Sequence, residues 1–205
     1  RHPHEKHQQG AGTCITWKKP LPSSCKEKRI FVAPKVRVYI VEMMVFSIEI
    51  LAFYISGAHD FKGRHGKSRN HNPITSKERV ECVTGKGIRG DRYFGFNENY
   101  KAQVTFFDEA VHQAVQENFG TSHTPDVYRR NILLRGLDLN SLVGKSFRLG
   151  EVEFEGVQEC TPCYWMDEAV APGTEDFLKN RGGLRTRVLS DGFLRLGETK
   201  LLIQD

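Results

Sequence analysis

The sequence predicts a mainly β or α+β fold, best described as a β-barrel with a few short helices. Two observations lead to this prediction. Short apolar or alternating segments, separated by glycine, asparagine and aspartate, follow one another through the second half of the chain, as they do in barrels and sandwiches. Only two segments of the chain show the features of a helix, so strands should dominate the core.

Residues 1–42 are predicted to be an N-terminal tail that is disordered or not part of the fold, and residues 43–205 a single domain. The tail mixes His, Gln, Gly, Ser and Pro and shows no helix or strand period before about residue 36. It holds nine Lys or Arg and only three Asp or Glu. An organelle-targeting peptide is the alternative interpretation, although the segment has few serines and no clear amphipathic helix.

The first expected element of the domain is a buried strand in VFSIEILAFYISG, ending at Gly57. Residues 36–55 are strongly apolar, but Arg37, Glu42 and Glu49 interrupt them, and charges at a helix centre are costly in lipid. We therefore expect no membrane span here. Residues 57–75 should then form a long loop, which in compact domains is usually functional or mobile. Its histidines, which lack helical ligand spacing, are either solvated or in contact with substrate: His59, His65 and His71.

Residues 79–95 read as a short strand followed by a turn region that is rich in glycine. Residues 101–120 then combine a strand with a clear helix, for which Asp108 is the expected N-cap and Gly120 the end. His112 lies one position past the apolar stripe of this helix, so we expect it to be solvated.

The rest of the chain is expected to be mostly strands, with one more helix in GTEDFLKNRGG, capped by Thr174 and stopped by Gly182. The sequence LSDGFL is typical of a hairpin with Asp191 and Gly192 at its tip. The expected strands cover residues 131–136, 146–150, 151–159, 185–192, 193–197 and 199–204.

Charge and cysteine content restrict the class of protein. The formal net charge is +5, but residues 43–205 hold 21 basic and 22 acidic residues, so the excess belongs to the tail. The domain gives no indication of a nucleic-acid-binding surface. Five cysteines is an odd number and suggests no disulfide framework, which favours a reducing compartment and a cytoplasmic location.

The pair Cys160 and Cys163, in the sequence CTPC, allows several interpretations. A structural zinc site would need two more ligands, and the chain has neither a second such pair nor a histidine after Cys163. A thioredoxin-type couple would belong early in a βαβ unit rather than before a run of strands. A single reactive thiolate, which binds soft metals or carries sulfur, is the third interpretation. Two inert buried thiols are the fourth.

Two arginine motifs make an anionic ligand a reasonable expectation. GDRYFG contains Asp91 and Arg92 between glycines, and YRRN contains Arg129, Arg130 and Asn131 just before an expected strand. Arginine binds phosphate and carboxylate through two parallel hydrogen bonds. Either motif alone is more typical of a surface ion pair, but the two together with a rigid thiol indicate a sulfur- or metal-bearing anionic ligand.

Three separated stretches resemble the MOSC domain, and they occur in the order expected for that family. They are GIRGDRYFG, YRRNILLRGLDLNSLVGKSFRLGEVEFEGVQECTPC and NRGGLRTRVLSDGFLRLGE. MOSC domains occur at the C-terminus of molybdenum cofactor sulfurases, in mitochondrial amidoxime-reducing components and as stand-alone bacterial proteins, and this chain is most similar to the stand-alone type. The resemblance covers roughly residues 44–205.

The resemblance implies a MOSC-type β-barrel and chemistry of the molybdenum cofactor (molybdopterin). The signature cysteine of the family falls on Cys163, which implies a metal ligand or a sulfur-relaying thiol. Asp91 and Arg92 match the family's GDR motif, and Arg129 and Asn131 match its R-x-N stretch. These residues are expected to line the pocket together with Arg130, with the arginines on the pterin phosphate. Cys160 is a further candidate, although many members lack a cysteine at its position.

Two functions follow from these expectations. One is a molybdenum-dependent reductase of small N-hydroxylated compounds, which would need electron-donor proteins because the chain shows no flavin or iron–sulfur motif. The other is a non-enzymatic sulfur carrier with a persulfide on Cys163. Its sulfur would come from a separate cysteine desulfurase, because these 205 residues contain no aminotransferase-like domain. A dithiol redox protein that uses Cys160 and Cys163 is a third interpretation.

Overall fold

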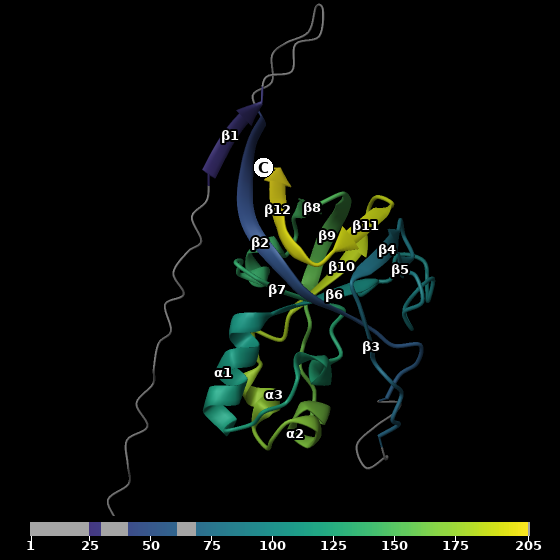
Figure 1. The fold of residues 1–205 in the computed structure, drawn as a ribbon, viewed down its shortest axis with the longest axis vertical. Helices are drawn as coiled ribbons and strands as arrows, with labels where there is room; N and C mark the ends of the chain where they lie inside the picture. The colour runs from purple at the N-terminus through teal and green to yellow at the C-terminus, as the bar shows by residue number, and fades with distance from the viewer. Residues whose placement is uncertain (1–24, 30–40, 61–68, 205) are drawn as a thin grey trace, which may run out of the picture.

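The computed structural model describes residues 25–29, 41–60 and 69–204. Figure 1 shows a barrel of strands with the helices gathered at one end of it. The prediction of a mainly β fold with a β-barrel and a few short helices is confirmed.

Seven strands of the larger sheet form a closed barrel in the order β2, β12, β8, β9, β10, β6, β7, and β7 pairs back with β2 to close it. Neighbours are antiparallel except β6 and β7, which are parallel. The strands are β2 (Val41–Ile55), β6 (Val104–Asp108), β7 (Ile132–Arg135), β8 (Ser146–Leu149), β9 (Val152–Glu159), β10 (Leu184–Val188) and β12 (Gly197–Gln204).

Strand β2 is the longest strand and has four partners. It pairs with β12 and β7 inside the barrel, and with the short strands β1 (Cys25–Arg29) and β3 (Thr75–Lys77) outside it. The register with β7 shifts between Ile50 and Ala52, and such an irregularity lets a long strand bend around a barrel. The predicted strand is confirmed. Of the predicted loop at residues 57–75, the described residues 57–60 and 69–74 form neither helix nor strand, β3 begins at Thr75, and residues 61–68 lie outside the described residues.

Most of the segment 1–42 lies outside the described residues, so its interpretation as a tail stays a prediction. Within it, β1 pairs with the start of β2, although the sequence shows no strand period there. The strand depends on a neighbour that a local sequence pattern does not reveal. No helix in the ranges that the structure describes is long and apolar enough to cross a membrane.

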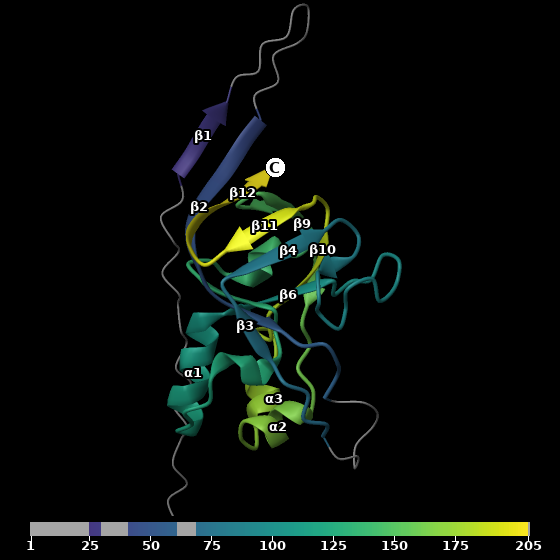
Figure 2. The same ribbon diagram turned by 45° about the vertical axis from the view of Figure 1, so that its right-hand side comes forward.

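A second, three-stranded sheet lies against the barrel, as Figure 2 shows, and consists of β11 (Gly192–Arg195), β4 (Arg79–Val83) and β5 (Gly87–Ile88). The predicted hairpin at Asp191 is therefore wrong, because β11 pairs with β4 and not with β10. Oδ1 of Asp191 accepts hydrogen bonds of 2.7 Å from both N and Oγ1 of Thr84. These bonds hold the turn to the smaller sheet.

The helical segments cover one end of the barrel. Helix α1 (Glu109–Phe119) begins and ends as predicted: the Asp108 side chain accepts a hydrogen bond from N of Ala110, and Gly120 is left-handed. The sequence missed α2 (Trp165–Ala169), and α3 (Thr174–Phe177) is shorter than expected, with Gly173 rather than Thr174 at the N-cap. The 3₁₀ turn η1 (Pro125–Tyr128) lies on the same side, with Tyr128 in the core beneath the helices, whereas η2 (Leu139–Leu142) adds Leu139 and Leu142 to the core inside the barrel.

His112 is buried, so the prediction that it is solvated is wrong. Its Nδ1 lies 3.2 Å from the hydroxyl of Tyr128, at the end of η1. Tyr128 covers this side of α1 and extends the buried face beyond the apolar stripe, and the hydroxyl gives the buried imidazole a polar partner. Burial lowers the pKa of His112, although Glu109 opposes this effect.

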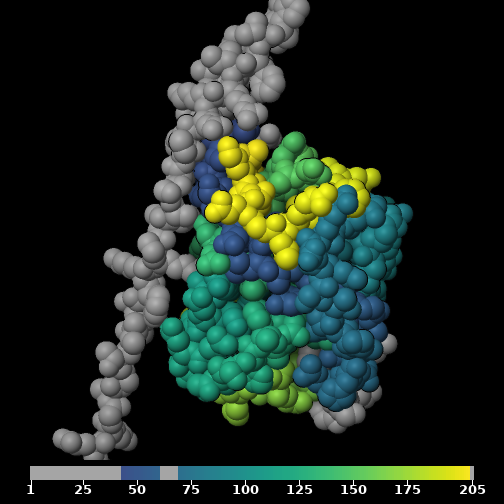
Figure 3. All heavy atoms as spheres, in the orientation of Figure 1, coloured from purple at the N-terminus to yellow at the C-terminus, as the bar shows by residue number. Residues whose placement is uncertain are grey.

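Strand β6 separates two hydrophobic cores because its side chains alternate. Phe106 belongs to the core inside the barrel, where it packs edge-on against Phe154 with ring centroids 5.3 Å apart. Phe107 points to the helical side and packs on Tyr128 at 4.3 Å. The space-filling view in Figure 3 shows the helical part packed below the barrel strands. Tyr128 and Met166 of the core on the helical side also line the candidate site.

Candidate functional site

A small polar cavity of about 200 Å³ lies between loops, strands and helix ends. Its walls come from the loop after β2, the connection from β5 to β6, strand β6, the end of η1, the CTPC loop, helix α2 and strand β10. The lining residues are His59, Asp60, Arg92, Tyr93, Tyr100, Ala102, Thr105, Tyr128, Arg129, Arg130, Cys160, Thr161, Cys163, Met166 and Arg185. Five of the seven residues predicted from the sequence are among them.

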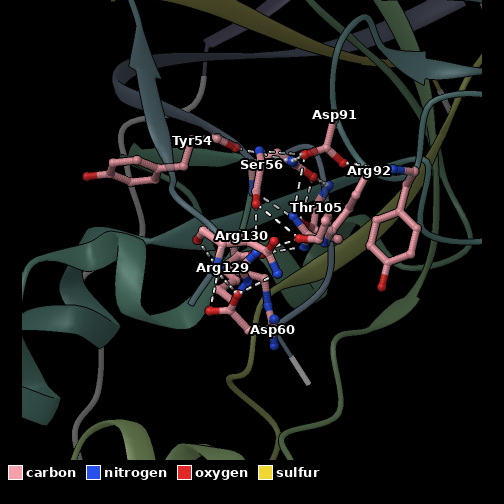
Figure 4. A network of polar contacts seen from close by, with 12 residues as sticks. Tyr54, Ser56, Asp60, Asp91, Arg92, Thr105, Arg129 and Arg130 are labelled. Atoms are coloured by element: carbon pink, nitrogen blue, oxygen red, sulfur yellow. Dashed lines mark hydrogen bonds and ion pairs between the residues drawn. The ribbon is translucent and has the colours of Figure 1, made fainter. Parts of the chain in front are cut away.

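The other two predicted residues, Asp91 and Asn131, lie behind the wall of the cavity. The Asp91 carboxylate accepts hydrogen bonds from N of Ser56 at 3.3 Å, N of Tyr93 at 3.1 Å and Nδ2 of Asn131 at 3.1 Å. It thereby ties the end of β2 to the GDRYFG turn, as Figure 4 shows. The role of Asp91 is therefore structural.

Asn131 is fully buried, and its side-chain amide joins three segments. Oδ1 accepts from N of Thr105 at 3.0 Å, and Nδ2 donates to the carbonyl of Tyr54 at 3.2 Å as well as to Asp91. An amide that uses both of its ends in this way fixes β2, β6 and β7 relative to one another. Asp91 and Asn131 therefore shape the cavity without reaching it.

Arg129 lines the cavity, but both terminal nitrogens of its guanidinium already donate hydrogen bonds to other residues of the protein. Nη1 donates to Oδ2 of Asp60 at 2.8 Å and to the carbonyl of Asn72 at 3.4 Å. Nη2 donates to Oγ of Ser56 at 2.8 Å and to the carbonyl of Ala58 at 2.9 Å. These four bonds hold the loop after β2 in place (Figure 4). Burial lowers the pKa of Arg129 and the charge of Arg92 adds to this, while Asp60 opposes them.

Arg92 is the most unusual of the lining residues. Its side chain is 8% exposed, and its Nε is buried with no hydrogen-bond partner in the described part of the chain. Nη2 donates to the carbonyl of Arg129 at 3.0 Å, and the guanidinium lies 4.7 Å from the centre of the Tyr93 ring. A buried donor without an acceptor is costly, so the orientation of Nε fits an acceptor supplied by a ligand.

Two further arginines add positive charge to the same wall. Arg130 donates from Nε to the carbonyl of Gly182 at 3.0 Å and from Nη1 to the carbonyl of Tyr128 at 2.9 Å. The side chain of Arg185, half-buried on β10, has no hydrogen bond or ion pair to any described residue. An unpaired guanidinium that lines the same cavity as Arg92 makes this cavity attractive to an anion.

The CTPC loop places two different thiols at the cavity. Cys163 is exposed, whereas Cys160 is buried, and neither forms a disulfide. The loop packs tightly on the residues that precede β10: a Cβ at Gly182 would lie 2.1 Å from the carbonyl oxygen of Cys160. The accessible thiol of Cys163 thus shares one cavity with the arginines. In the ranges that the structure describes, no group of three or more His, Cys, Asp or Glu is placed to hold a metal ion.

Reasoning from the sequence named His59 as a possible substrate contact but missed the rest of the aromatic side of the cavity. Tyr93 and Tyr100 line the cavity together with His59, and neither tyrosine was among the predicted site residues. Arg185 was also missed, although the stretch NRGGLRTRV contains it. The alternation of Arg185, Thr186 and Arg187 in a strand is the signal that could have drawn attention to it.

A larger cavity of about 500 Å³ lies on the other side of Gly57 and Gly90, between β3, β4 and β11. Arg79 lies over the ring of Phe193 there, 3.5 Å from its centre, and Arg89 pairs with Glu81. It contains no thiol and no residue predicted from the sequence. The smaller cavity, which joins the thiol to the unpaired guanidinium, is therefore the candidate site.

Comparisons with known proteins agree with this fold. The barrel resembles the YUAD protein from Bacillus subtilis, with a TM-score of 0.59 and 17% identity over 78% of this chain and 98% of that one. It also resembles YiiM from Geobacillus stearothermophilus (TM-score 0.54, 16% identity, 77% and 75% coverage). YiiM from Escherichia coli gives a TM-score of 0.51 and 15% identity, with 77% and 69% coverage. A search of curated proteins found no match.

The sequence pattern of the MOSC domain matches residues 65–199. This range includes the GDRYFG turn, the YRRN stretch, the CTPC loop and β10, which together form most of the cavity. The chain therefore belongs to the MOSC domain family.

Proposed function

We propose that this protein binds the molybdenum cofactor and reduces small N-hydroxylated compounds, with Cys163 as the metal ligand. The observation that carries the proposal is one cavity that holds an accessible thiol and two arginines, Arg92 and Arg185. Among the residues that the structure describes, neither the buried Nε of Arg92 nor the guanidinium of Arg185 has a hydrogen-bond partner. Membership of the MOSC family agrees with a link to this cofactor.

The residues present fit an anionic, sulfur-seeking ligand. Thiolates bind soft metals, and Cys163 is exposed whereas Cys82 and Cys160 are buried. Arg92, Arg130 and Arg185 would neutralise the phosphate of the cofactor, because each keeps at least one guanidinium nitrogen without a described partner. Arg129, Asp91 and Asn131 would hold the walls rather than the ligand.

When bound, the cofactor supplies a redox-active metal, which the side chains of this protein cannot provide. The residues of the chain supply the rest. Cys163 anchors the metal, the arginines orient the anionic end, and the buried network behind them keeps both in place. Reduction of an N–OH group uses two electrons and two protons and releases water. The electrons would come from a partner electron-donor protein, and the free cysteines suit a reducing compartment such as the cytoplasm.

The test is to produce the protein in cells with intact cofactor synthesis and to measure molybdenum and pterin in the purified protein. Wild type should contain both, and Cys163→Ala should lose the metal. Arg195→Gln, which changes an exposed arginine on β11 away from the cavity, is the matched surface control and should keep both. Absence of molybdenum and pterin from wild type as well as from the variants would contradict the proposal.

The exposure of Cys163 also favours a second function, a sulfur carrier loaded by a cysteine desulfurase. A thiol that a partner enzyme can reach is able to accept sulfur as a persulfide. Intact-mass measurement after incubation with a desulfurase and cysteine should then show one added sulfur that reductant removes, and Cys163→Ser should show none. If Cys163 cannot be labelled in the folded protein, this function is excluded.

A further inference from the structure

The larger cavity, of about 500 Å³, is a groove beside the smaller sheet, and the proposed cofactor contacts lie outside it. Figure 2 shows β11 and β4 side by side, with β3 below them. These three strands line the groove together with the end of β2 and the segment that follows β5. The groove is thus a second concave surface of the molecule, separate from the candidate cavity.

This groove has an apolar bottom and a mainly basic rim. Ile55 and Val80 are the buried residues among those that line it, and both belong to the hydrophobic core inside the barrel. The charged lining residues are exposed or half-buried, and three of the four are basic: Lys77, Arg79, Arg89 and Glu81. A ligand of this groove should therefore combine an anionic group with an apolar body.

Glu81 is already neutralised, and this leaves two positive charges at the rim. Nε of Arg89 donates to Oε2 of Glu81 at 2.7 Å, and Nη2 donates to Oε1 at 2.9 Å, so the two side chains form a bidentate pair. The side chains of Lys77 and Arg79, in contrast, have no hydrogen bond or ion pair to any residue that the structure describes. Two unpaired cations match a phosphate monoester, which carries a charge of about −1.5 to −2 at pH 7.

Arg79 is held in position before a ligand binds. Its guanidinium carbon Cζ lies 3.5 Å from the centre of the Phe193 ring, which belongs to the neighbouring strand β11. A guanidinium that stacks on an aromatic face keeps its N–H groups available at its edges. Because the stacked side chain is already ordered, it loses less freedom when it binds an anion.

We propose that this groove binds a small organic phosphate monoester, with Arg79 and Lys77 on the phosphate and the apolar body of the ligand over Ile55 and Val80. The groove volume of about 500 Å³ lies within the range of roughly 300–1,000 Å³ that is typical of small-molecule sites. The proposal goes beyond the proposed function and is independent of it, because the groove and the candidate cavity share no lining residue.

The two sites are neighbours, so the test must distinguish them. Gly57 and Gly90 line the groove, whereas His59 and Arg92, each two residues further along the chain, line the candidate cavity. The candidate cavity is basic as well and can attract the same anion. A measurement that reports on single residues is therefore needed.

The experiment titrates phenyl phosphate into the isotope-labelled full chain and follows the backbone amides by NMR. The amides of Val80, Glu81 and Phe193 should shift and saturate. Phenol lacks the charge and inorganic phosphate lacks the apolar body, so both should bind more weakly than phenyl phosphate. Added salt should weaken the binding of phenyl phosphate, because the two cations are exposed to solvent.

Substitutions then test which side chains bind the phosphate. Arg79→Gln should weaken the binding of phenyl phosphate by about 10-fold, since it removes a hydrogen bond between charged groups. Phe193→Leu, which removes the ring under Arg79 but keeps an apolar side chain, should weaken it by about 2- to 5-fold. Arg181→Gln is the matched control and should keep the affinity of wild type. Arg181 also lies over a phenylalanine ring, that of Phe177 at 4.6 Å, but lines neither cavity.

Three results would each overturn the proposal. The first is the absence of saturable shifts at the groove, including the case in which they are confined to the amides of Tyr93 and Arg185 in the candidate cavity. The second is equal affinity of wild type and Arg79→Gln for phenyl phosphate at the groove. The third is equal affinity of wild type for phenol and phenyl phosphate. The measurement needs neither molybdenum nor an electron donor, so its failure is distinct from a failure of the proposed function.

Discussion

Arg129 and Asp60 form a buried ion pair in which Nη1 of Arg129 lies 2.8 Å from Oδ2 of Asp60, with side chains 6% and 1% exposed. The same carboxylate accepts from N of Asn72 at 2.7 Å and from Nε of Arg69 at 3.3 Å. The pair therefore joins the YRRN stretch to both described ends of the loop after β2. An anion bound by Arg129 would have to displace Asp60, so we expect the role of Arg129 to be structural.

Arg129→Met should destabilise the fold strongly. It would leave the buried Asp60 carboxylate without its main cation, and breaking such a pair costs roughly 3–5 kcal/mol. Urea unfolding followed by circular dichroism measures the free energy of unfolding. Arg195→Met, at an exposed position, should change it by less than about 0.5 kcal/mol. A variant at Arg129 that keeps its stability but loses the cofactor would show that this arginine is a ligand.

The Asp60 carboxylate should make stability depend on pH in the acid range. Burial alone would raise its pKa, but the hydrogen bonds from Asn72 and the charge of Arg129 outweigh this and lower it. A group whose pKa is lowered by folding contributes stability above its unfolded pKa, and this contribution is lost as pH falls through the folded value. Wild type should lose stability on acidification below about pH 4, and Asp60→Asn should be less stable at neutral pH with a flatter acid slope. If the stability of wild type and of Asp60→Asn falls equally steeply with acidification, Asp60 is not the source of the pH dependence.

Gly182→Ala should displace the CTPC loop. The new Cβ would lie 2.1 Å from the carbonyl oxygen of Cys160 and 3.3 Å from Cδ of Pro162, and backbone atoms cannot move aside cheaply. Overpacking of this kind costs roughly 1–3 kcal/mol. Gly57→Ala is the matched control, because nothing lies within 4 Å of its Cβ position. Unfolding by urea measures the free energy of unfolding of both variants. Equal values would mean that the loop tolerates the displacement.

Cys82, Cys160 and Cys163 should differ in reactivity in the folded protein. Cys163 is exposed, whereas Cys160 and Cys82 are buried, and burial raises the pKa of Cys82 to about 12. Because the thiolate is the reactive form, a brief pulse of iodoacetamide should label Cys163 and spare the other two. Peptide mass spectrometry reads the sites, and labelling after denaturation confirms that all three react. If iodoacetamide labels Cys160 before Cys163, Cys160 rather than Cys163 is the reactive thiol.

Arg185→Gln should lower the amount of bound cofactor without affecting the fold. Its guanidinium has no partner among the described residues and faces the cavity, so its loss leaves no buried group unpaired. Pterin released from the purified protein should fall relative to wild type, while the free energy of unfolding changes by less than about 0.5 kcal/mol. Arg187→Gln tests a neighbour on the same strand that is paired with Glu155 and does not line the cavity. Equal pterin loss in both variants would point to a general charge effect.

The sequence was sufficient to predict the seven barrel strands and helix α1 because these depend on local patterns. Asp108 and Gly120 mark the two ends of α1 by their own chemistry. Which strands pair with one another depends on contacts between distant parts of the chain, which local patterns do not reveal. Asp191 and Gly192 indicate a turn, but its side-chain contact with Thr84, 107 residues away, directs β11 to the other sheet.

The candidate site was predicted in outline for the same reason. The motifs named five residues that line the cavity, yet they could not distinguish arginines that face a ligand from those that face the protein. Arg129 and Arg92 look alike in sequence, and only the position of Asp60 shows that one is occupied while the other keeps a free Nε. His112 was misjudged because Tyr128, which covers it, belongs to a separate turn.

The placement of β12 between β2 and β8 has a consequence for synthesis of the chain. The barrel wall cannot be completed until residues 197–204 have left the ribosome, so one edge of β2 lacks its barrel partner while all the other barrel strands are synthesised. Non-local pairing of this kind makes folding slow, and open strand edges invite association with other chains. Loss of the last eight residues of β12 should therefore yield aggregates rather than a smaller soluble barrel.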